Sequence, residues 1–248
     1  MLDPTLGLAL GGGGALGAAH VGVLKALGER RLRPGIVAGT SAGSLVGAAY
    51  AAGLPVVRIE RLVRRATWST FGRLTPSLRL GLLDSSALLD TIGELGGEPL
   101  IEDLPRQFAA IATDLRTRQQ IVFNEGPLGP ALRASIAVPG LFAPVITPDR
   151  VLVDGGLAAN LPIGAARSLG ATRVIAVRLR PEWERVPVVR SAESIARMEH
   201  DPDVLMIRPD LSGMSQWSRD DVPKLIDAGY RAAAQALDET RAREDNVA

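Results

Sequence analysis

The sequence predicts an α/β fold with a mainly parallel sheet that carries helices on both faces. Short apolar runs alternate with helical patterns along the chain, and glycine-rich turns stand between several of them. Parallel strands need a crossover connection, usually a helix, so this alternation favours a mainly parallel sheet. The chain of 248 residues is long enough for one large domain, and no repeat or linker divides it. We therefore expect a single domain over 1–248.

The individual elements follow from length and periodicity. Apolar runs predict strands at 6–10, 35–39, 108–114, 119–124, 150–154, 173–178 and 203–208. Apolar residues at helical spacing predict helices at 17–30, 44–53, 162–170 and 222–242. The polar residues 243–248 are expected to form a frayed tail.

The stretch 54–104 differs from the rest, because it is rich in arginine and places Trp68 and Phe71 among the charges. One interpretation is a lid or cap that touches a membrane surface or an apolar substrate. The other is a helix with a solvated basic face and aromatic side chains in the core, which is the commoner use of such a pattern. We favour the second interpretation.

The composition excludes some classes of function and indicates the cellular compartment. The formal net charge is +1, which gives no reason to expect a nucleic-acid partner. The chain has no cysteine, so it has no disulfide and no thiolate metal site. The first residues lack a basic leader, and no apolar run approaches the roughly 18 to 20 residues of a transmembrane helix. We expect a cytoplasmic protein.

The first motif with chemical meaning is Gly39-Thr40-Ser41-Ala42-Gly43, a G-x-S-x-G between a predicted strand and a predicted helix. That context is the one a nucleophile elbow requires, because a sharp turn makes the serine hydroxyl protrude. Gly39, Ala42 and Gly43 are small enough for the strand and the helix to approach each other closely. The alternative is that Ser41 only caps the helix.

The second motif is a run of four glycines after the first predicted strand: Gly11, Gly12, Gly13 and Gly14. Such a loop can turn several N–H groups toward one anion, as an oxyanion hole does. The same residues also satisfy the dinucleotide pattern G-x-G-x-x-G, which needs an acidic residue near the end of the second strand. That strand ends in Gly39-Thr40-Ser41, which counts against a dinucleotide. A third interpretation stays open: the glycines only allow the helix to pack closely on the strand.

The third motif is Asp154-Gly155-Gly156 at the end of a predicted strand. Carboxyl ends of parallel strands line the ligand crevice of an α/β sheet, so Asp154 can face Ser41 at the edge of the sheet. The alternative is an Asp-Gly turn with no chemical role.

Together these motifs resemble the patatin-like phospholipase family, and 112–115, 134–145 and 158–177 fit it as well. The chain is most similar to small bacterial members that consist of the catalytic domain alone. The resemblance implies a three-layer α/β/α sandwich and a Ser–Asp dyad. It implies Ser41 as nucleophile, Asp154 as general base, and Gly11 to Gly14 as the oxyanion loop. It requires no metal and no organic cofactor.

One residue departs from the family pattern: Leu16 stands before Gly17, where the family commonly has a cation. His20 is expected to be packed and hydrogen-bonded. His200 follows Ser41 and Asp154 in the order of an α/β-hydrolase triad, but the motifs favour the dyad. Asp114 is a fallback base that more readily anchors a loop.

Two further residues have structural interpretations. Phe142 is expected to line or support an apolar acyl pocket, and Asn160 to cap the helix that begins near Pro162.

The sequence thus predicts a serine acyl-ester hydrolase that acts on lipids, of the phospholipase A or lysophospholipase kind, with transient contact to a membrane surface. A short-chain esterase or thioesterase is an alternative substrate class. An alternative outside the enzymes is a non-catalytic regulatory or adaptor protein that keeps the fold. Leu16 favours this alternative, and the presence of Ser41 and Asp154 counts against it. A nucleotide-dependent oxidoreductase is the third alternative function.

Overall fold

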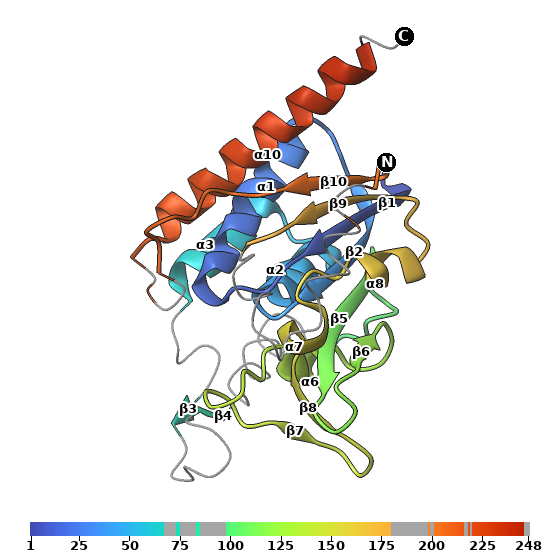
Figure 1. Ribbon diagram of the computed structural model, residues 1–248, viewed down its shortest axis with the longest axis vertical. Helices are drawn as coiled ribbons and strands as arrows, with labels where there is room; N and C mark the ends of the chain where they lie inside the picture. The colour runs from blue at the N-terminus through green and yellow to red at the C-terminus, as the bar shows by residue number, and fades with distance from the viewer. Residues whose placement is uncertain are drawn as a thin grey trace.

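The computed structural model describes residues 1–66, 98–179, 201–215 and 220–245, together with 73–74, 83–84, 198 and 218. Its centre is an eight-stranded mixed sheet in the order β10-β9-β1-β2-β5-β8-β7, with β6 paired to β5 (Figure 1). The strands are β1 (Asp3–Leu10), β2 (Pro34–Thr40), β5 (Gln107–Asp114), β6 (Gln120–Phe123), β7 (Val145–Ile146), β8 (Val151–Asp154), β9 (Arg173–Val177) and β10 (Val204–Ile207). A separate antiparallel pair consists of β3 (Arg73–Leu74) and β4 (Leu83–Asp84).

The sheet has a parallel half and an antiparallel half. The strands β10, β9, β1, β2 and β5 run parallel to one another. Beyond β2, the strands β6 and β8 pair with β5 antiparallel, and β7 pairs with β8 antiparallel. The parallel strands are buried over most of their length and read as continuous apolar runs, as expected for strands covered on both faces.

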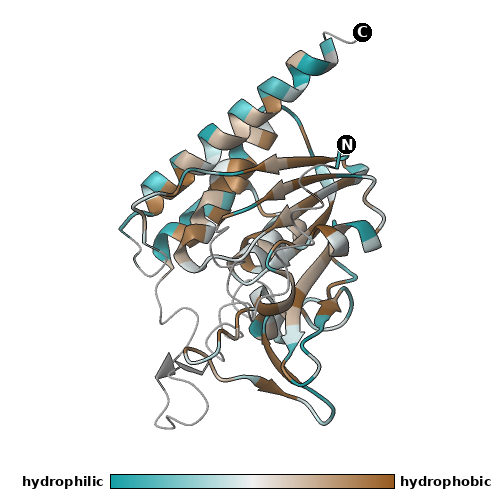
Figure 2. Ribbon diagram, in the orientation of Figure 1, coloured by the Kyte–Doolittle hydropathy of each residue, from teal (hydrophilic) through white to brown (hydrophobic). Residues whose placement is uncertain are grey.

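Helices cover both faces of this sheet, so the fold is the predicted three-layer α/β/α sandwich (Figure 1). Leu8 and Leu10 of β1 face the layer that contains α1 and α10, whereas Ala9 between them faces α8. Figure 2 shows the strands β9 and β10 mostly in the brown of hydrophobic residues. The helical elements are η1 (Gly14–Ala18), α1 (Ala19–Glu29), α2 (Ala42–Ala51), α3 (Val56–Arg65), α6 (Leu128–Ser135), α7 (Gly156–Ala159), α8 (Ile163–Ser168) and α10 (Val222–Asp245).

Most predicted elements are confirmed within a few residues, and the structure differs at three helices; the short elements β7 and α7 were also not predicted. The first helix begins with the 3₁₀ turn η1, whose first residue, Gly14, has a left-handed φ of 59°. The helix α10 continues to Asp245, past 242, where the pattern predicted its end. The helix α6 was not predicted, because its eight residues include Gly129 and Pro130, which are poor helix formers.

The helices α1 and α10 cross in direct backbone contact. A Cβ atom on Gly22 would overlap the Ile226 carbonyl oxygen, and one on Gly229 would overlap the Ala19 carbonyl oxygen. The crossing is flanked by an ion pair between Arg30 and an aspartate of α10, with an N–O distance of 2.9 Å. Two glycines therefore set how closely the longest helix packs on the body of the protein.

The arginine-rich stretch 54–104 is described only in part. The helix α3 buries Ile59 and exposes Arg58, Arg61 and Arg65, as predicted for a helix with a solvated basic face. Trp68 and Phe71 lie outside the described residues, so the lid interpretation stays a prediction.

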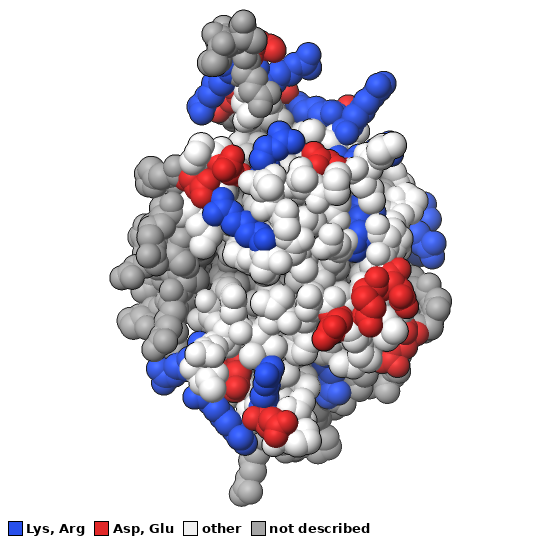
Figure 3. All heavy atoms as spheres, turned by 90° about the vertical axis from the view of Figure 1, so that its right-hand side faces the viewer, with Lys and Arg blue, Asp and Glu red and all other residues white. Residues whose placement is uncertain are grey.

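The surface carries both signs of charge. On the face in Figure 3, Lys and Arg side chains stand among Asp and Glu side chains, in keeping with the formal net charge of +1. Within the ranges given above, none of the helices combines the length and apolar character that crossing a membrane requires.

Candidate active site

Ser41 lies on a sharp turn between β2 and α2, as its motif predicts. Its backbone has φ 53° and ψ −123°, a left-handed conformation that a non-glycine residue adopts only when its surroundings impose it. A Cβ atom on Gly43 would overlap the Leu10 carbonyl oxygen, and one on Gly39 would come within 2.5 Å of the Ser44 Cα atom. The two glycines of the motif therefore let the strand, the helix and the glycine loop meet around Ser41.

The backbone of Ser41 is hydrogen-bonded on both sides. Its N–H donates to Ser135 Oγ at 3.0 Å, and its carbonyl accepts from Ser44 N at 2.8 Å and from Ser44 Oγ at 2.6 Å. The Ser44 contacts belong to the first turn of α2. Ser135 comes from the end of α6, 94 residues away in the chain, and no spacing in the sequence links it to Ser41.

The glycine loop lies directly against Ser41. A Cβ atom on Gly12 would come within 3.2 Å of the Ser41 Cβ atom. The N–H of Gly11 donates to the Val177 carbonyl at 3.1 Å, and that of Gly12 donates to the Asn160 carbonyl at 3.1 Å. Within the described part of the chain, the N–H groups of Gly13 and Gly14 donate no backbone hydrogen bond. Of the four predicted oxyanion donors, Gly11 and Gly12 are thus engaged in holding the loop.

His20 and Leu16 support this loop from the buried side. His20 is completely buried, and its Nε2 lies 2.8 Å from the Gly11 carbonyl oxygen, so the ring donates this hydrogen bond as the Nε2–H tautomer. Burial lowers the pKa of His20 to about 4, although the Gly11 carbonyl favours the charged ring. The predicted packed, hydrogen-bonded histidine is confirmed. Leu16 belongs to the core under the loop and brings no charge there.

Asp154 reaches Ser41 by a different route from the predicted one. We expected the carboxyl ends of parallel strands to meet, but β8 runs antiparallel to β5. Along β5, Ile111 pairs with Thr40 on one side and Ala112 pairs with Asp154 on the other. The strand β8 therefore runs in the opposite direction to β2 and β5. Its last residue, Asp154, lies beside β5 at the level where β2 ends and Ser41 follows.

The Asp154 carboxyl group is buried and only partly hydrogen-bonded. Its Oδ1 accepts from the Gly156 N–H at 2.7 Å, whereas its buried Oδ2 has no hydrogen bond of ordinary geometry within the described residues. Burial raises the pKa of Asp154 to about 6, against smaller opposing effects of the nearby Ser41 side chain and the Gly156 N–H. A carboxylate in this state has a higher proton affinity than an exposed one, and it lies next to a serine hydroxyl.

Glycine is required beside Asp154 for steric reasons. A Cβ atom on Gly155 would overlap the Ile111 carbonyl oxygen, and one on Gly156 would come within 3.0 Å of Asp154 Oδ1. The Asp-Gly-Gly motif thus packs the start of α7 against β5 and keeps a backbone N–H on the carboxylate.

Three other residues singled out in the sequence occupy defined places. Asp114 accepts the N–H of Arg116 at 3.0 Å and so anchors its own turn. Asn160 does not cap α8, whose N-cap is Pro162; it follows α7 and holds the Gly12 N–H instead. Phe142 is buried.

His200 lies outside the described residues, so its place in a triad stays untested. Among the residues that the structure describes, no group of three His, Asp or Glu side chains could hold a metal ion.

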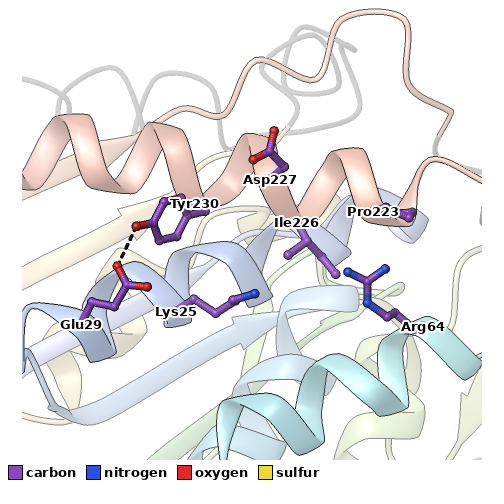
Figure 4. Close-up of a pocket in the computed structure, with 7 residues that line it drawn as sticks. All are labelled: Lys25, Glu29, Arg64, Pro223, Ile226, Asp227 and Tyr230. Atoms are coloured by element: carbon purple, nitrogen blue, oxygen red, sulfur yellow. Dashed lines mark hydrogen bonds between the residues drawn. The ribbon is translucent and has the colours of Figure 1, made fainter.

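An open groove of about 300 Å³ lies elsewhere, between α1, α3 and α10 (Figure 4). Its charges are balanced, because Lys25 and Arg64 stand with Glu29 and Asp227, and the Tyr230 hydroxyl donates to Glu29 at 2.6 Å. The groove contains none of the residues around Ser41. We assign it to helix packing.

The structure thus defines an α/β protein with a buried serine and a buried aspartate at the carboxyl ends of strands β2 and β8. A model of the family described as patatin-like phospholipase matches residues 8–167, and the chain belongs to that family. The resemblance inferred from the motifs is confirmed.

Relatives that match in sequence agree with this membership. An uncharacterized NTE family protein of Mycobacterium tuberculosis is 41% identical over 182 residues, which cover 71% of this chain and 49% of that protein. Patatin-like phospholipase domain-containing protein 6 of Homo sapiens is 37% identical over 180 residues, 70% of this chain and 13% of that protein. The chain therefore spans about half the length, or less, of these relatives.

The fold has a solved counterpart in VipD from Legionella pneumophila. That structure has a TM-score of 0.63 and 14% sequence identity, and the match covers 96% of this chain and 67% of VipD. ExoU from Pseudomonas aeruginosa matches with a TM-score of 0.56 and 17% identity, over 96% of this chain and 53% of ExoU. At these identities the likeness shows the fold alone.

Proposed function

We propose that the protein is a serine acyl-ester hydrolase that acts on lipid esters through Ser41 and Asp154. The observation that carries the proposal is a serine at a sharp strand–helix turn beside a buried carboxylate whose pKa is raised to about 6. Membership in a family described as patatin-like phospholipase supports a lipid ester as the substrate. A general base is most effective when its pKa lies near the working pH, and burial brings Asp154 closer to that condition.

In the proposed reaction, Asp154 accepts the proton of the Ser41 hydroxyl while the Ser41 oxygen attacks the ester carbonyl. The tetrahedral intermediate collapses as Asp154 returns the proton to the leaving alcohol, which leaves an acyl group on Ser41. A water molecule then attacks the acyl carbonyl and gives its proton to Asp154. Collapse of the second intermediate releases the acid, and Ser41 recovers its proton from Asp154.

The negative charge of both intermediates needs donors that are already in place. We assign this role to the N–H groups of Gly13 and Gly14, since those of Gly11 and Gly12 are engaged elsewhere. The loop is fixed by the hydrogen bond from His20 to the Gly11 carbonyl. Removal of a single oxyanion donor typically costs about 2.7 to 4 kcal/mol of transition-state stabilisation.

The test is hydrolysis of p-nitrophenyl esters of increasing chain length and of phospholipid vesicles by the wild type and Ser41→Ala. We expect the wild type to turn over long-chain esters and a fluorophosphonate to label Ser41. The alanine variant should retain less than about 1% of the activity, because the nucleophile is gone. A preference for short chains would replace the lipid substrate by a small ester. A wild type that neither hydrolyses any ester nor takes the label would favour a non-catalytic protein.

The pH dependence of kcat/KM should show one ascending limb with an apparent pKa near 6. Asp154 must be ionised to accept a proton, so activity is lost as the pH falls through its folded-state pKa of about 6. The profile is measured from about pH 4.5 to 8 with alkaline quenching, a range that brackets this pKa, and circular dichroism checks that the protein stays folded. His200→Ala should keep the same limb. Loss of the limb in that variant would assign it to the histidine.

A further inference from the structure

The segment at the end of α6 joins the two halves of the proposed dyad. Ser135 Oγ accepts the N–H of Ser41 at 3.0 Å, and the Ser135 carbonyl accepts the N–H of Gly155 at 3.4 Å. Two residues further on, the Ala137 carbonyl accepts the N–H of Asp154 at 2.8 Å. One short piece of chain therefore contacts the backbone of the nucleophile and that of the base.

The hydrogen bond to Ser41 has particular weight, because the Ser41 backbone adopts a left-handed conformation that its surroundings must impose. Ser135 is completely buried, and its hydroxyl oxygen is the one acceptor of the Ser41 N–H within the described part of the chain. Without it, a buried N–H would have no partner, which costs more than the hydrogen bond itself contributes to stability. The turn would then gain by rotating the N–H toward another acceptor.

The geometry points to Ser135 as a positioning residue that fixes the orientation of Ser41 relative to Asp154. The inference rests on the proposed function. Ser135 acts through the backbone of Ser41 and touches no reacting atom. Rotation of the Ser41 peptide would move its hydroxyl away from both the carboxylate and the glycine loop, and a displacement of about 1 Å at a reacting atom can cost about 10²-fold in rate.

Ser44 provides a matched control on the other side of Ser41. It is also completely buried, and its Oγ donates to the Ser41 carbonyl at 2.6 Å. That carbonyl also accepts the N–H groups of Ser44 and Leu45, at 2.8 and 3.3 Å. Loss of the Ser44 hydroxyl therefore leaves the carbonyl satisfied, whereas loss of the Ser135 hydroxyl leaves the Ser41 N–H unpaired.

The experiment compares the wild type, Ser135→Ala and Ser44→Ala in kcat and KM for a p-nitrophenyl ester, with each variant shown to be folded by thermal unfolding. We expect Ser135→Ala to lower kcat by about tenfold or more and to change KM less than about twofold, since ester binding is untouched. Ser44→Ala should stay within about threefold of the wild-type kcat. A wild-type kcat for Ser135→Ala, or equal losses in both variants, would overturn the inference.

Amide hydrogen exchange of the segment 39–45 gives a readout that does not depend on activity. Ser135→Ala should lose protection at the Ser41 amide, and Ser44→Ala should keep it. If the wild type neither hydrolyses esters nor takes a fluorophosphonate, the proposed function fails, and the exchange result alone decides whether Ser135 holds the turn. Unchanged exchange of the Ser41 amide in Ser135→Ala would refute the claim that Ser135 holds the turn. If the alanine variant does not fold, Ser135→Cys keeps the volume, offers a weaker acceptor, and should show an intermediate loss of kcat.

Discussion

Replacing Asp154 by Asn is expected to reduce kcat by about 10² to 10⁴-fold and, above about pH 6, to stabilise the protein. The loss of activity follows from the proposed mechanism, because an amide cannot accept the proton of Ser41. Asparagine has almost the same shape as aspartate and can keep the contact with the Gly156 N–H through its carbonyl oxygen. The measurement is the ester assay together with urea unfolding at about pH 4 and about pH 8.

The stabilisation follows from burial of the charge. The pKa of Asp154 is about 6 in the folded state, against 3.8 for an exposed aspartate, the value that applies to the unfolded chain. Between these values the folded protein binds more protons than the unfolded one, so the free energy of unfolding falls as the pH rises. Above about pH 6 the full penalty is present, and it corresponds to about 3 kcal/mol. The amide in the Asp154→Asn variant carries no charge, so the gain should approach that value at about pH 8 and disappear below about pH 4.

Asp114→Asn is the matched control, since Asp114 is also buried and also ends a strand. Its carboxylate holds the Arg116 N–H and has no proposed role in the reaction. We expect this variant to keep turnover within a few-fold of the wild type, because Asp114 holds its own turn and does not contact Ser41. Equal gains for Asp154→Asn at the acidic and the alkaline pH would show that the buried charge is not their source. Full activity of Asp154→Asn would remove it as the base.

Gly22→Ala is expected to destabilise the protein by about 3 kcal/mol or more. A methyl group at this position overlaps the Ile226 carbonyl oxygen in α10 and lies 2.5 Å from the Tyr230 nitrogen. Both are backbone atoms and cannot rotate away. The helices α1 and α10 must separate, which opens the core cluster that contains Leu24 and Leu225. Urea unfolding by circular dichroism measures the effect.

Gly28→Ala is the control on the same helix. Apart from its chain neighbours and the nearby backbone of its own helix, no atom lies within 4 Å of the position that its Cβ would occupy. Gly28 is the last but one residue of α1, and alanine in place of a helical glycine with a compatible backbone stabilises by up to about 1 kcal/mol, because the unfolded chain loses conformational freedom. The two substitutions are chemically identical and should have effects of opposite sign. A destabilisation of Gly22→Ala no larger than about 1 kcal/mol would mean that the crossing adapts easily.

The sequence predicted the parallel half of the sheet well, because its signals are local. Buried parallel strands read as apolar runs, and the turn at Ser41 requires glycine on both sides of the serine. The same holds for the glycine loop, whose four glycines are consecutive in the chain. These features depend on residues that are neighbours in the chain, so pattern and spacing suffice to find them.

The part of the site that comes from the antiparallel strand β8 and from α6 could not be predicted from the sequence. The motif indicated Asp154, but only the pairing of β8 with β5 explains how it reaches Ser41. The hydrogen bond from Ser41 to Ser135 spans 94 residues, and the short helix that carries Ser135 contains Gly129 and Pro130, which disguise it as a turn. Which glycine N–H groups are engaged also depends on contacts with Val177 and Asn160, distant in the chain.

By itself, the sequence determined the α/β class, the family resemblance, and the serine, aspartate and glycine loop as candidates. The tertiary structure decided how strand direction brings the aspartate to the serine, which backbone groups of the loop are already bonded, and how deeply the carboxylate is buried. The physical reason is that a motif specifies local backbone geometry, whereas proton affinity and hydrogen-bond partners depend on groups that meet only when the chain has folded.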